Sequence, residues 1–332
     1  MGTQGPLLLK PRLDTKIWGG TRLAQFGFDA TADDPIGEAV ITAPEATTQD
    51  GQRLGDNVAG TPEQTLGSRG LAATGGRPFF PLLAKLIDAK NDLSIQVHPD
   101  DHYAAKISDG QSLGKTEAWW VIAARPGSSL YLGLRDGASH ADLAATSRSG
   151  TGCGHLMRRV PAQPNTLVFL PAGTIHALGA GVMVYEIQQP SAITYRLDDW
   201  NRRDSSGQTR DLHIEDGLAV ADVSSRPDPL PPIEFPTAHG RRQRLVSCPY
   251  FALERIALVA GDEVVVSAPD SPQIITVLHG AVHVTADDRG IGVPLGQTAA
   301  LLADASATTV RATAPAVVLR AWVPKSYERC TR

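Results

Sequence analysis

The stretch "SIQVHPDD", residues 94–101, is the part of the chain from which the fold and the site can first be argued. Successive side chains of a strand point to opposite faces, so Gln96 and His98 are expected on one face, about 6.5 Å apart at Cα. Pro99 disfavours a helical conformation at His98 and ends the hydrogen-bond ladder. The pattern predicts a strand that presents a glutamine and a histidine at its end, beside a turn where a ligand can be reached.

Two further motifs add ligand-type side chains. "GKTEAWWVI" places Glu117 at the start of a strand-like run, and "LPAGTIHALG" delivers His176 after an apolar strand and a Pro-x-Gly turn. Together with Gln96 and His98 they offer two imidazoles, a carboxylate and an amide oxygen. This set suits zinc and leaves room for a water or a substrate, so we expect a zinc site.

Other histidine pairs give competing interpretations. A single histidine is more often an ordinary side chain than a ligand. His98 and His102 have the i, i+4 spacing of helical zinc motifs, but Pro99 keeps His98 extended and off the helix face. His279 and His283 share a strand face about 13 Å apart, too far for one metal, and are interpreted as ordinary side chains.

Length and charge exclude several classes of protein. The chain has 332 residues and a formal net charge of −4, which gives no case for a nucleic-acid or anionic-membrane partner. No apolar run has membrane-spanning length, and no signal-peptide pattern opens the sequence. The three cysteines, Cys153, Cys248 and Cys330, are far apart and predict neither a disulfide framework nor a cysteine zinc site. We expect a soluble cytoplasmic protein, a monomer or small homo-oligomer.

Short β-type runs such as "VMVYEIQ", "EVVVSA" and "IITVL", bounded by turn residues, predict a mainly β sandwich or barrel. Helical signals are few. "DDHYAAKI" predicts a short helix, and "SHADLAAT" another, with Ser139 as N-cap and Asp142 completing a capping box. Residues 43–78 lack clean periodicity and are interpreted as a surface excursion with some helix. Trp119 and Trp120 are assigned to the core.

Five prolines in "RPDPLPPIEFPTAHG", residues 226–240, predict an extended linker. We therefore expect a catalytic domain at 1–235 and a C-terminal domain at 240–332. The segments 165–178 and 297–310 align without gaps, and Thr308 then stands at the position of His176. This alignment predicts a degenerate repeat whose second copy has lost its metal ligand.

The order Gln-x-His, Glu, Pro-x-Gly-x-x-His resembles the metal motifs of a cupin. The strings "IWGGTRL", "PLLAKLIDAKNDLSIQVHPDD", "GKTEAWWVI", "LPAGTIHALGAGVMVYEIQ" and "SAITYRLDDWNR" resemble type I mannose-6-phosphate isomerases in their short bacterial form. The resemblance implies two cupin-like jelly rolls with a few short helices, the first binding one zinc per chain and the second metal-free. It also implies interconversion of mannose 6-phosphate and fructose 6-phosphate through a cis-enediol, with this sugar phosphate as the partner.

The resemblance also implies roles for single residues. Gln96, His98, Glu117 and His176 match the zinc ligands, and Lys115 in "GKTE" matches the active-site lysine. Glu186 matches the acidic site residue, and Arg196 matches an arginine that is assigned to the enediolate charge. Ser94 and Arg202 match phosphate-site residues, and a lysine stands at the position of Arg202 in some relatives.

Two positions depart from the family pattern: Val40 stands where a tryptophan is expected, and Ala192 stands where many relatives carry aspartate.

Several alternatives stay open from the sequence. The proton-transferring base is Glu186, a zinc-bound water or a group near His98. The same ligands also suit ferrous iron in a dioxygenase, and a non-catalytic sugar-phosphate-binding cupin would keep the fold. Arg196 and Arg202 are alternatively surface partners of nearby aspartates, in pairs worth about 0–1 kcal/mol each.

Overall fold

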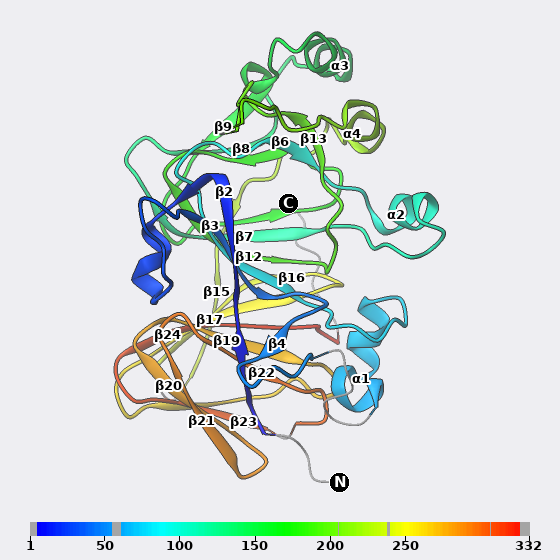
Figure 1. Cartoon of the computed structure of the whole chain (residues 1–332). Coiled ribbons are helices and arrows are strands. Elements are labelled where there is room, and N and C mark those ends of the chain that lie inside the picture. The colour runs from blue at the N-terminus through cyan, green and yellow to red at the C-terminus, as the bar shows by residue number, and fades with distance from the viewer. Residues whose placement is uncertain (1–4, 55–60, 205, 238–239, 306, 326–332) are drawn as a thin grey trace.

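The computed structural model describes residues 5–54, 61–204, 206–237, 240–305 and 307–325. Within them the chain is mainly β, and its strands form four antiparallel sheets in two stacked lobes (Figure 1). The predicted fold class, two cupin-like jelly rolls with few helices, is confirmed. None of the described helices is long and apolar enough to cross a membrane.

The first jelly roll consists of a seven-stranded and a five-stranded sheet. The larger sheet has the order β14 (Pro229–Leu230), β10 (Leu167–Leu170), β7 (Glu117–Ala124), β12 (Val182–Gln188), β5 (Leu83–Asp88), β3 (Ile36–Thr42) and β2 (Arg12–Gly20). The smaller sheet has the order β13 (Tyr195–Asp198), β6 (Ile95–Val97), β11 (His176–Leu178), β8 (Ser129–Leu134) and β9 (Met157–Pro161).

The second jelly roll has the same design. Its larger sheet has the order β15 (Ile233–Phe235), β16 (Arg241–Ser247), β17 (Ala252–Leu258), β24 (Ala316–Trp322), β19 (Gln273–His279), β22 (Thr298–Leu301), β1 (Leu7–Lys10) and β4 (Thr47–Thr48). Its smaller sheet has the order β18 (Glu263–Val266), β23 (Thr308–Ala312), β20 (Ala281–Ala286) and β21 (Arg289–Pro294).

The pairing order repeats between the halves, as the aligned segments predict. Strands β5, β12, β7 and β10 neighbour one another in the first jelly roll as β17, β24, β19 and β22 do in the second. β11 begins at His176 between β6 and β8, and β23 begins at Thr308 between β18 and β20. The strand register matches as well. Lys85 of β5 faces Glu186 of β12 in the first jelly roll. Glu254 of β17 faces Arg320 of β24 at the corresponding position of the second.

Apolar cores lie inside each jelly roll and between the two large sheets. Trp119 and Val184 of the seven-stranded sheet pack inside the first jelly roll, and Val284 packs inside the second. Between the two large sheets, Tyr185 of the first and Leu319 of the second are fully buried. The large sheet of the first jelly roll is thus covered on both faces.

The N-terminal strand crosses the division expected at the proline-rich linker, and the division itself stays a prediction. β1 pairs with β22, so the first strand of the chain extends the large sheet of the second jelly roll. The linker itself supplies one edge strand to each half, β14 to the first and β15 to the second. Residues 1–4, 238–239 and 326–332 of the two expected domains, with Cys330, lie outside the described residues.

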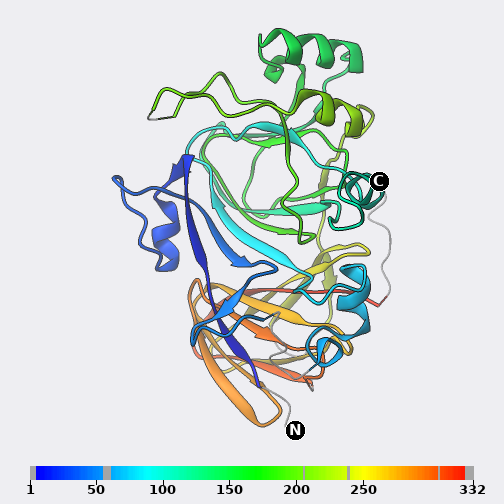
Figure 2. The ribbon, with the colours of Figure 1, turned by 45° about the vertical axis from the view of Figure 1, so that its right-hand side comes forward.

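The helices lie at the periphery (Figure 2). They are α1 (Pro62–Ala73), α2 (Asp101–Ile107), α3 (His140–Ser149) and α4 (Ile214–Val220). The predicted helices at 100–107 and 139–146 are present. Ser139 and Asp142 form the expected capping box, and Asp100 caps α2 by accepting from the Tyr103 amide at 2.8 Å. The expected helix within 43–78 is α1.

A buried ion pair in the second jelly roll gives a test of this packing. Arg320 lies 2.8 Å from Glu254, and both are almost completely buried. Arg320→Met removes one of the two arginines that pair with the buried Glu254 carboxylate and leaves only Arg242, 2.8 Å from Oε2. It is expected to lower the free energy of unfolding by about 3 kcal/mol. Urea denaturation measures this. Arg241→Met, which breaks the exposed pair with Glu234, is the matched control and should leave the midpoint nearly unchanged. Equal effects of the two changes would contradict the packing.

Candidate active site

Strand alternation gathers the site on the inner face of the seven-stranded sheet. Glu117 begins β7, and Trp119 follows two residues later on the same face. On the neighbouring strand β12, Glu186 stands directly opposite Trp119, and on its other side opposite Lys85 of β5. Three adjacent strands therefore place Trp119, Glu186 and Lys85 in one row across the sheet.

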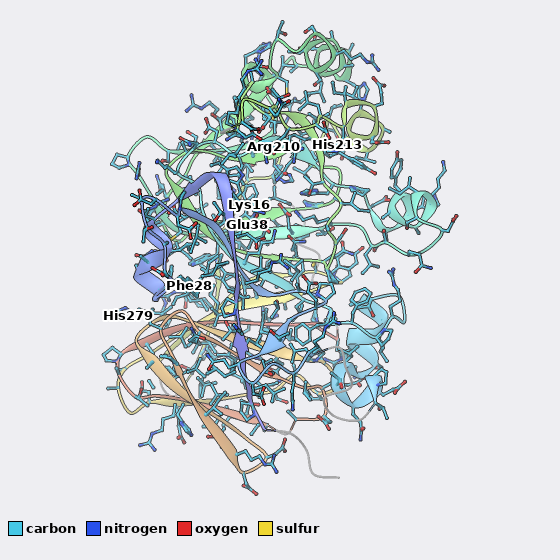
Figure 3. The ribbon with its side chains drawn as sticks, viewed as in Figure 1. Lys16, Phe28, Glu38, Arg210, His213 and His279 are labelled. Carbon is cyan, nitrogen blue, oxygen red and sulfur yellow. The ribbon has the colours of Figure 1, made fainter. Side chains whose placement is uncertain are left out.

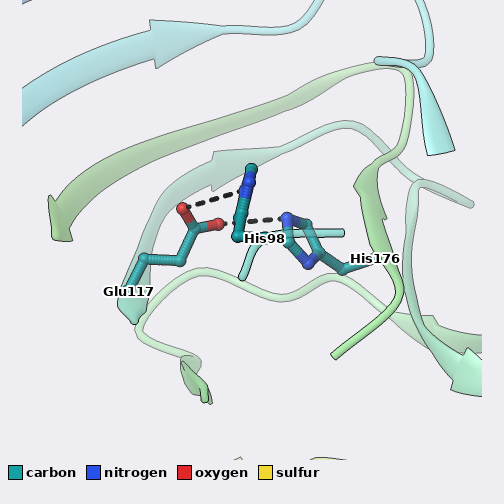
Figure 4. Close-up of side chains that lie close together, drawn as sticks. All are labelled: His98, Glu117 and His176. Atoms are coloured by element: carbon teal, nitrogen blue, oxygen red, sulfur yellow. Dashed lines mark ion pairs between the residues drawn. The ribbon is translucent and has the colours of Figure 1, made fainter. Parts of the chain in front are cut away.

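Three predicted ligands converge above this sheet. One ligand atom each of His98, Glu117 and His176 lies within 4.8 Å of the others, and all three residues are buried (Figure 4). His98 Nδ1 lies 3.0 Å from the Ile193 carbonyl, and His176 Nδ1 lies 2.8 Å from the Thr174 carbonyl. These contacts assign the ring protons to Nδ1 and leave each Nε2 lone pair for a ligand.

The buried atoms of this cluster fit a metal ion. Both carboxylate oxygens of Glu117 and Nε2 of His176 are buried without a hydrogen bond of acceptable geometry, although Glu117 Oε1 and His176 Nε2 are 3.2 Å apart. Such atoms are costly unless a cation satisfies them. The Lys115 ammonium lies close to Glu117 Oε2, whereas Glu117 Oε1 and His176 Nε2 have no cation beside them among the described residues. Burial raises the pKa of Glu117, but Lys115 and the two histidines together hold it well below its usual range. Burial, followed by Lys115, lowers the pKa of His98. Both residues then have the protonation states that metal ligands need.

Gln96 completes the predicted set. It lies in the middle of β6, directly paired with His176 of β11. The turn before His176 is tied to the same place, because Gly173, at φ +87°, donates its amide to the His98 carbonyl at 2.8 Å. Only a glycine adopts this backbone conformation without strain. Within the described residues no other group of three His, Cys, Asp or Glu side chains could hold a metal.

Lys115 lies against the ligands. Its Nζ is 2.9 Å from His98 Nε2 and 2.7 Å from Glu117 Oε2. These are two atoms that a metal would bind, so the ammonium group and a metal ion compete for them. Metal binding therefore requires the ammonium group to move away from these two atoms. Lys115 also lines the cavity beside the cluster.

A cavity of about 570 Å³ opens beside the metal ligands. This volume suits a small phosphorylated sugar. Five of the residues singled out in the sequence line it: Ser94, Gln96, Lys115, Glu186 and Arg196. Val40 and Ala192, the two departures from the family pattern, line it too.

A chain of alternating charges crosses the cavity wall, and the sequence analysis assigned no role to it. Lys85 Nζ lies 3.2 Å from Glu186 Oε1 and 3.6 Å from Glu38 Oε1. Lys16 Nζ lies 3.4 Å from Glu38 Oε2, and these two residues are labelled next to each other in Figure 3. Burial lowers the pKa of Lys85, but Glu186 and Glu38 raise it by more. The signal was present in "LLAKLID", where a single lysine interrupts a buried strand.

Trp119 was assigned only to the core. Its indole Nε1 donates a hydrogen bond of 2.9 Å to Glu186 Oε2, and its ring stands edge-on to His176 with centroids 5.2 Å apart. Trp120 points to the opposite face and packs in the core between the two large sheets. The core assignment is confirmed for both tryptophans, and for Trp119 it is incomplete.

Arg196 brings an uncompensated positive charge to the cavity. Its Nη1 donates to the Asp211 carbonyl at 2.7 Å, while its buried Nε has no hydrogen-bond partner. No carboxylate of the described residues makes an ion pair with it. Burial, and then the charge of Arg210, lower its pKa. A guanidinium in this state is a receptor for an anion.

Arg202 is not among the residues that line this cavity, and its expected role at the phosphate stays a prediction. The backbone turns at Trp200 and Asn201, with φ of 58° and 52°, and carries Arg202 onto Asp199 and the Asp92 carbonyl.

The returning chain brings Arg210 to the cavity instead (Figure 3). Arg210 Nε donates to Asp199 Oδ2 at 2.8 Å. Asp199 therefore holds both arginines, and only Arg210 reaches the cavity.

Among the described residues of the second jelly roll, no group of three His, Cys, Asp or Glu side chains lies close enough to hold a metal. Thr308 occupies the position that corresponds to His176. His279 is exposed at the end of β19, far from the cavity (Figure 3), and His283 is exposed on β20. Both agree with their interpretation as ordinary side chains.

Comparisons with known proteins agree with this geometry. Residues 7–114 match the model of the family described as phosphomannose isomerase type I, catalytic domain. The chain is 34% identical over 261 residues to a mannose-6-phosphate isomerase of Bacillus subtilis strain 168, covering 76% of this chain and 79% of that protein. It is 33% identical over 285 residues to the Streptococcus mutans mannose-6-phosphate isomerase, covering 84% and 87%.

Solved structures share the fold over nearly the whole chain. The crystal structure of the mannose 6-phosphate isomerase from Bacillus subtilis has a TM-score of 0.81 and 29% identity, and the match covers 96% of this chain and 99% of that one. A zinc-bound mannose 6-phosphate isomerase has a TM-score of 0.74 at 16% identity, covering 96% and 99%, and shows the likeness of the fold alone.

The charge chain gives a pH prediction. The folded pKa of Lys85 is raised, so its contribution to stability is complete below the unfolded lysine pKa of about 10.4 and is lost only at higher pH. Lys85→Met is expected to lower the free energy of unfolding by about 3 kcal/mol or more, equally at pH 7.5 and pH 9. Urea denaturation at the two pH values measures the free energy of unfolding of the wild type and of Lys85→Met. If the two proteins were equally stable at pH 9, Lys85 would be neutral at that pH.

Proposed function

The chain belongs to the type I phosphomannose isomerase family and is an isomerase of mannose 6-phosphate, and we propose that it forms fructose 6-phosphate through a cis-enediol with one zinc ion per chain. One observation supports the proposal most strongly. The buried cluster of His98, Glu117 and His176 lies beside a cavity whose wall carries Glu186, and Lys85 pairs with that carboxylate. An acid–base group and a metal site next to one small cavity suit a proton transfer beside a polarised carbonyl.

Zinc is the metal we propose, held by Gln96, His98, Glu117 and His176. Bound there, it would polarise the carbonyl and hydroxyl oxygens of the sugar as a Lewis acid. The ligand types favour zinc, and the similarly folded isomerase that is zinc-bound supports the choice. His98 and His176 are oriented for this task by the carbonyls at their Nδ1 atoms.

Glu186 is our candidate for the proton carrier. It takes the proton from C2 of the open-chain aldose and returns it to C1 of the cis-enediol, while the hydroxyl proton of O2 passes to O1. Its Oε1 is buried without a hydrogen bond, and its Oε2 is held by Trp119. The Lys85 ammonium lies 3.2 Å from Oε1, so it balances the negative charge of Glu186 while the carboxylate still faces the cavity.

Arg196 is assigned to the negative charge that develops on the enediolate oxygens. Its guanidinium has no carboxylate partner among the described residues, so its charge is available to an oxyanion. Ser94 and Arg210 are assigned to the phosphate. Arg210 replaces Arg202 in this role because it lines the cavity. Remote phosphate binding positions the reacting carbons.

Metal dependence is the first test. We expect about one zinc per chain, and loss of activity with a strong chelator that added zinc restores. Glu117→Ala should lose metal and activity together and stay folded, as elemental analysis, a coupled isomerase assay and circular dichroism will show. Full activity of a verified metal-free protein would refute the proposal, and restoration by ferrous iron but not zinc would favour the iron-dependent alternative.

Steady-state kinetics on mannose 6-phosphate separates the arginines. A contact made mainly in the transition state lowers kcat, whereas one made equally with the ground state raises KM. Arg196→Ala should lower kcat by roughly a hundredfold, and Arg196→Lys should recover only part. Arg210→Ala should mainly raise KM. Arg202→Ala is the control and should change KM much less. A larger KM effect from Arg202→Ala than from Arg210→Ala would restore Arg202 to the phosphate site.

A further inference from the structure

We infer that Trp119 is a positioning residue of the reaction, which orients the Glu186 carboxylate through its indole N–H; this inference rests on the proposed role of Glu186. The observation is the 2.9 Å hydrogen bond from Trp119 Nε1 to Glu186 Oε2 at the cavity wall. Trp119 is 1% exposed and Glu186 is 4% exposed, so the bond joins two almost fully buried side chains. A hydrogen bond to a buried charge is among the stronger ones in proteins.

The two oxygens of Glu186 have different surroundings. Oε2 accepts from Trp119, whereas Oε1 is buried without a hydrogen bond and faces only the Lys85 ammonium at 3.2 Å. Fixing one oxygen of a carboxylate fixes the direction of the other. Trp119 therefore leaves Oε1 as the oxygen that exchanges a proton with substrate, and it prevents the carboxylate from rotating fully onto Lys85.

Trp119 is itself held rigidly. Its backbone is paired directly with Glu186 on one side and with Val168 on the other, in the interior of the seven-stranded sheet. Its ring stands edge-on to His176 at 82°, with the centroids 5.2 Å apart. The indole thus spans the gap between the metal cluster and the carboxylate. A proton carrier needs this kind of support, because small misplacements of a reacting group are costly in rate.

The test compares two matched variants of the same dipeptide. Trp119→Phe keeps an aromatic ring and removes the N–H, while Trp120→Phe makes the same change on the face that packs in the core between the sheets. Trp119→Phe is expected to lower kcat about ten- to hundredfold, the scale of one hydrogen bond to a charge, with little change in KM. Trp120→Phe should keep kcat near the wild-type value. Both proteins are assayed at matched zinc content and after a check of folding.

A second readout identifies the affected step. With mannose 6-phosphate deuterated at C2, Trp119→Phe should show a larger isotope effect on kcat than the wild type, because proton transfer becomes more rate-limiting. In a Glu186→Gln background the same tryptophan change should have almost no further effect on kcat. This double-mutant cycle shows whether Trp119 acts through Glu186, since a residue that acts elsewhere keeps its full effect.

The possible outcomes are decisive. A kcat within twofold of wild type for Trp119→Phe, an undiminished effect in the Glu186→Gln background, or a loss of zinc that accounts for the lost activity would each overturn the positioning role. The last of these would assign Trp119 to His176 instead. Absence of isomerase activity in the zinc-loaded wild type would instead refute the proposed function, so the two failures are distinguishable.

Discussion

Strict alternation of side chains in the seven-stranded sheet is the constraint on which the site depends. Lys85, Trp119 and Glu186 point into the first jelly roll, while their sequence neighbours Trp120 and Tyr185 point into the core shared with the second. The same three strands therefore build the reacting surface and the contact between the lobes. A slip of one residue in any of them would bury the charges between the sheets and expose the apolar side chains to the cavity.

Charge compensation is the second requirement, because ionised groups this deep are costly unless they are paired. In the first jelly roll, Lys85 compensates Glu186 and Glu38, and the carboxylate remains directed at the cavity. The second jelly roll has the reversed pair at the corresponding positions, Glu254 and Arg320, joined directly at 2.8 Å. One architecture thus places an ion pair at the wall of a cavity in one half and a buried ion pair in the other.

The sequence could single out the candidate ligands because each stood in a local pattern with one physical interpretation. His98 was kept extended by Pro99, and His176 followed a turn that needs a glycine at position 173. The position of Arg202 outside the cavity has an equally local cause. Two residues with positive φ reverse the chain just before it, and such a reversal at tryptophan and asparagine has no strong sequence signal. Arg210, eight residues later, is at the cavity instead.

The sequence by itself determined the mainly β class and the family, and it supplied the candidate metal ligands, because strand period, turn residues and motif order are local properties of the chain. The tertiary structure alone decided which charges meet. Lys85 and Glu186 are a hundred residues apart, and only the register between β5 and β12 makes them neighbours. Trp119 is likewise an ordinary buried aromatic in the sequence, and it gains a chemical partner only because the strand beside it places a carboxylate opposite its indole N–H.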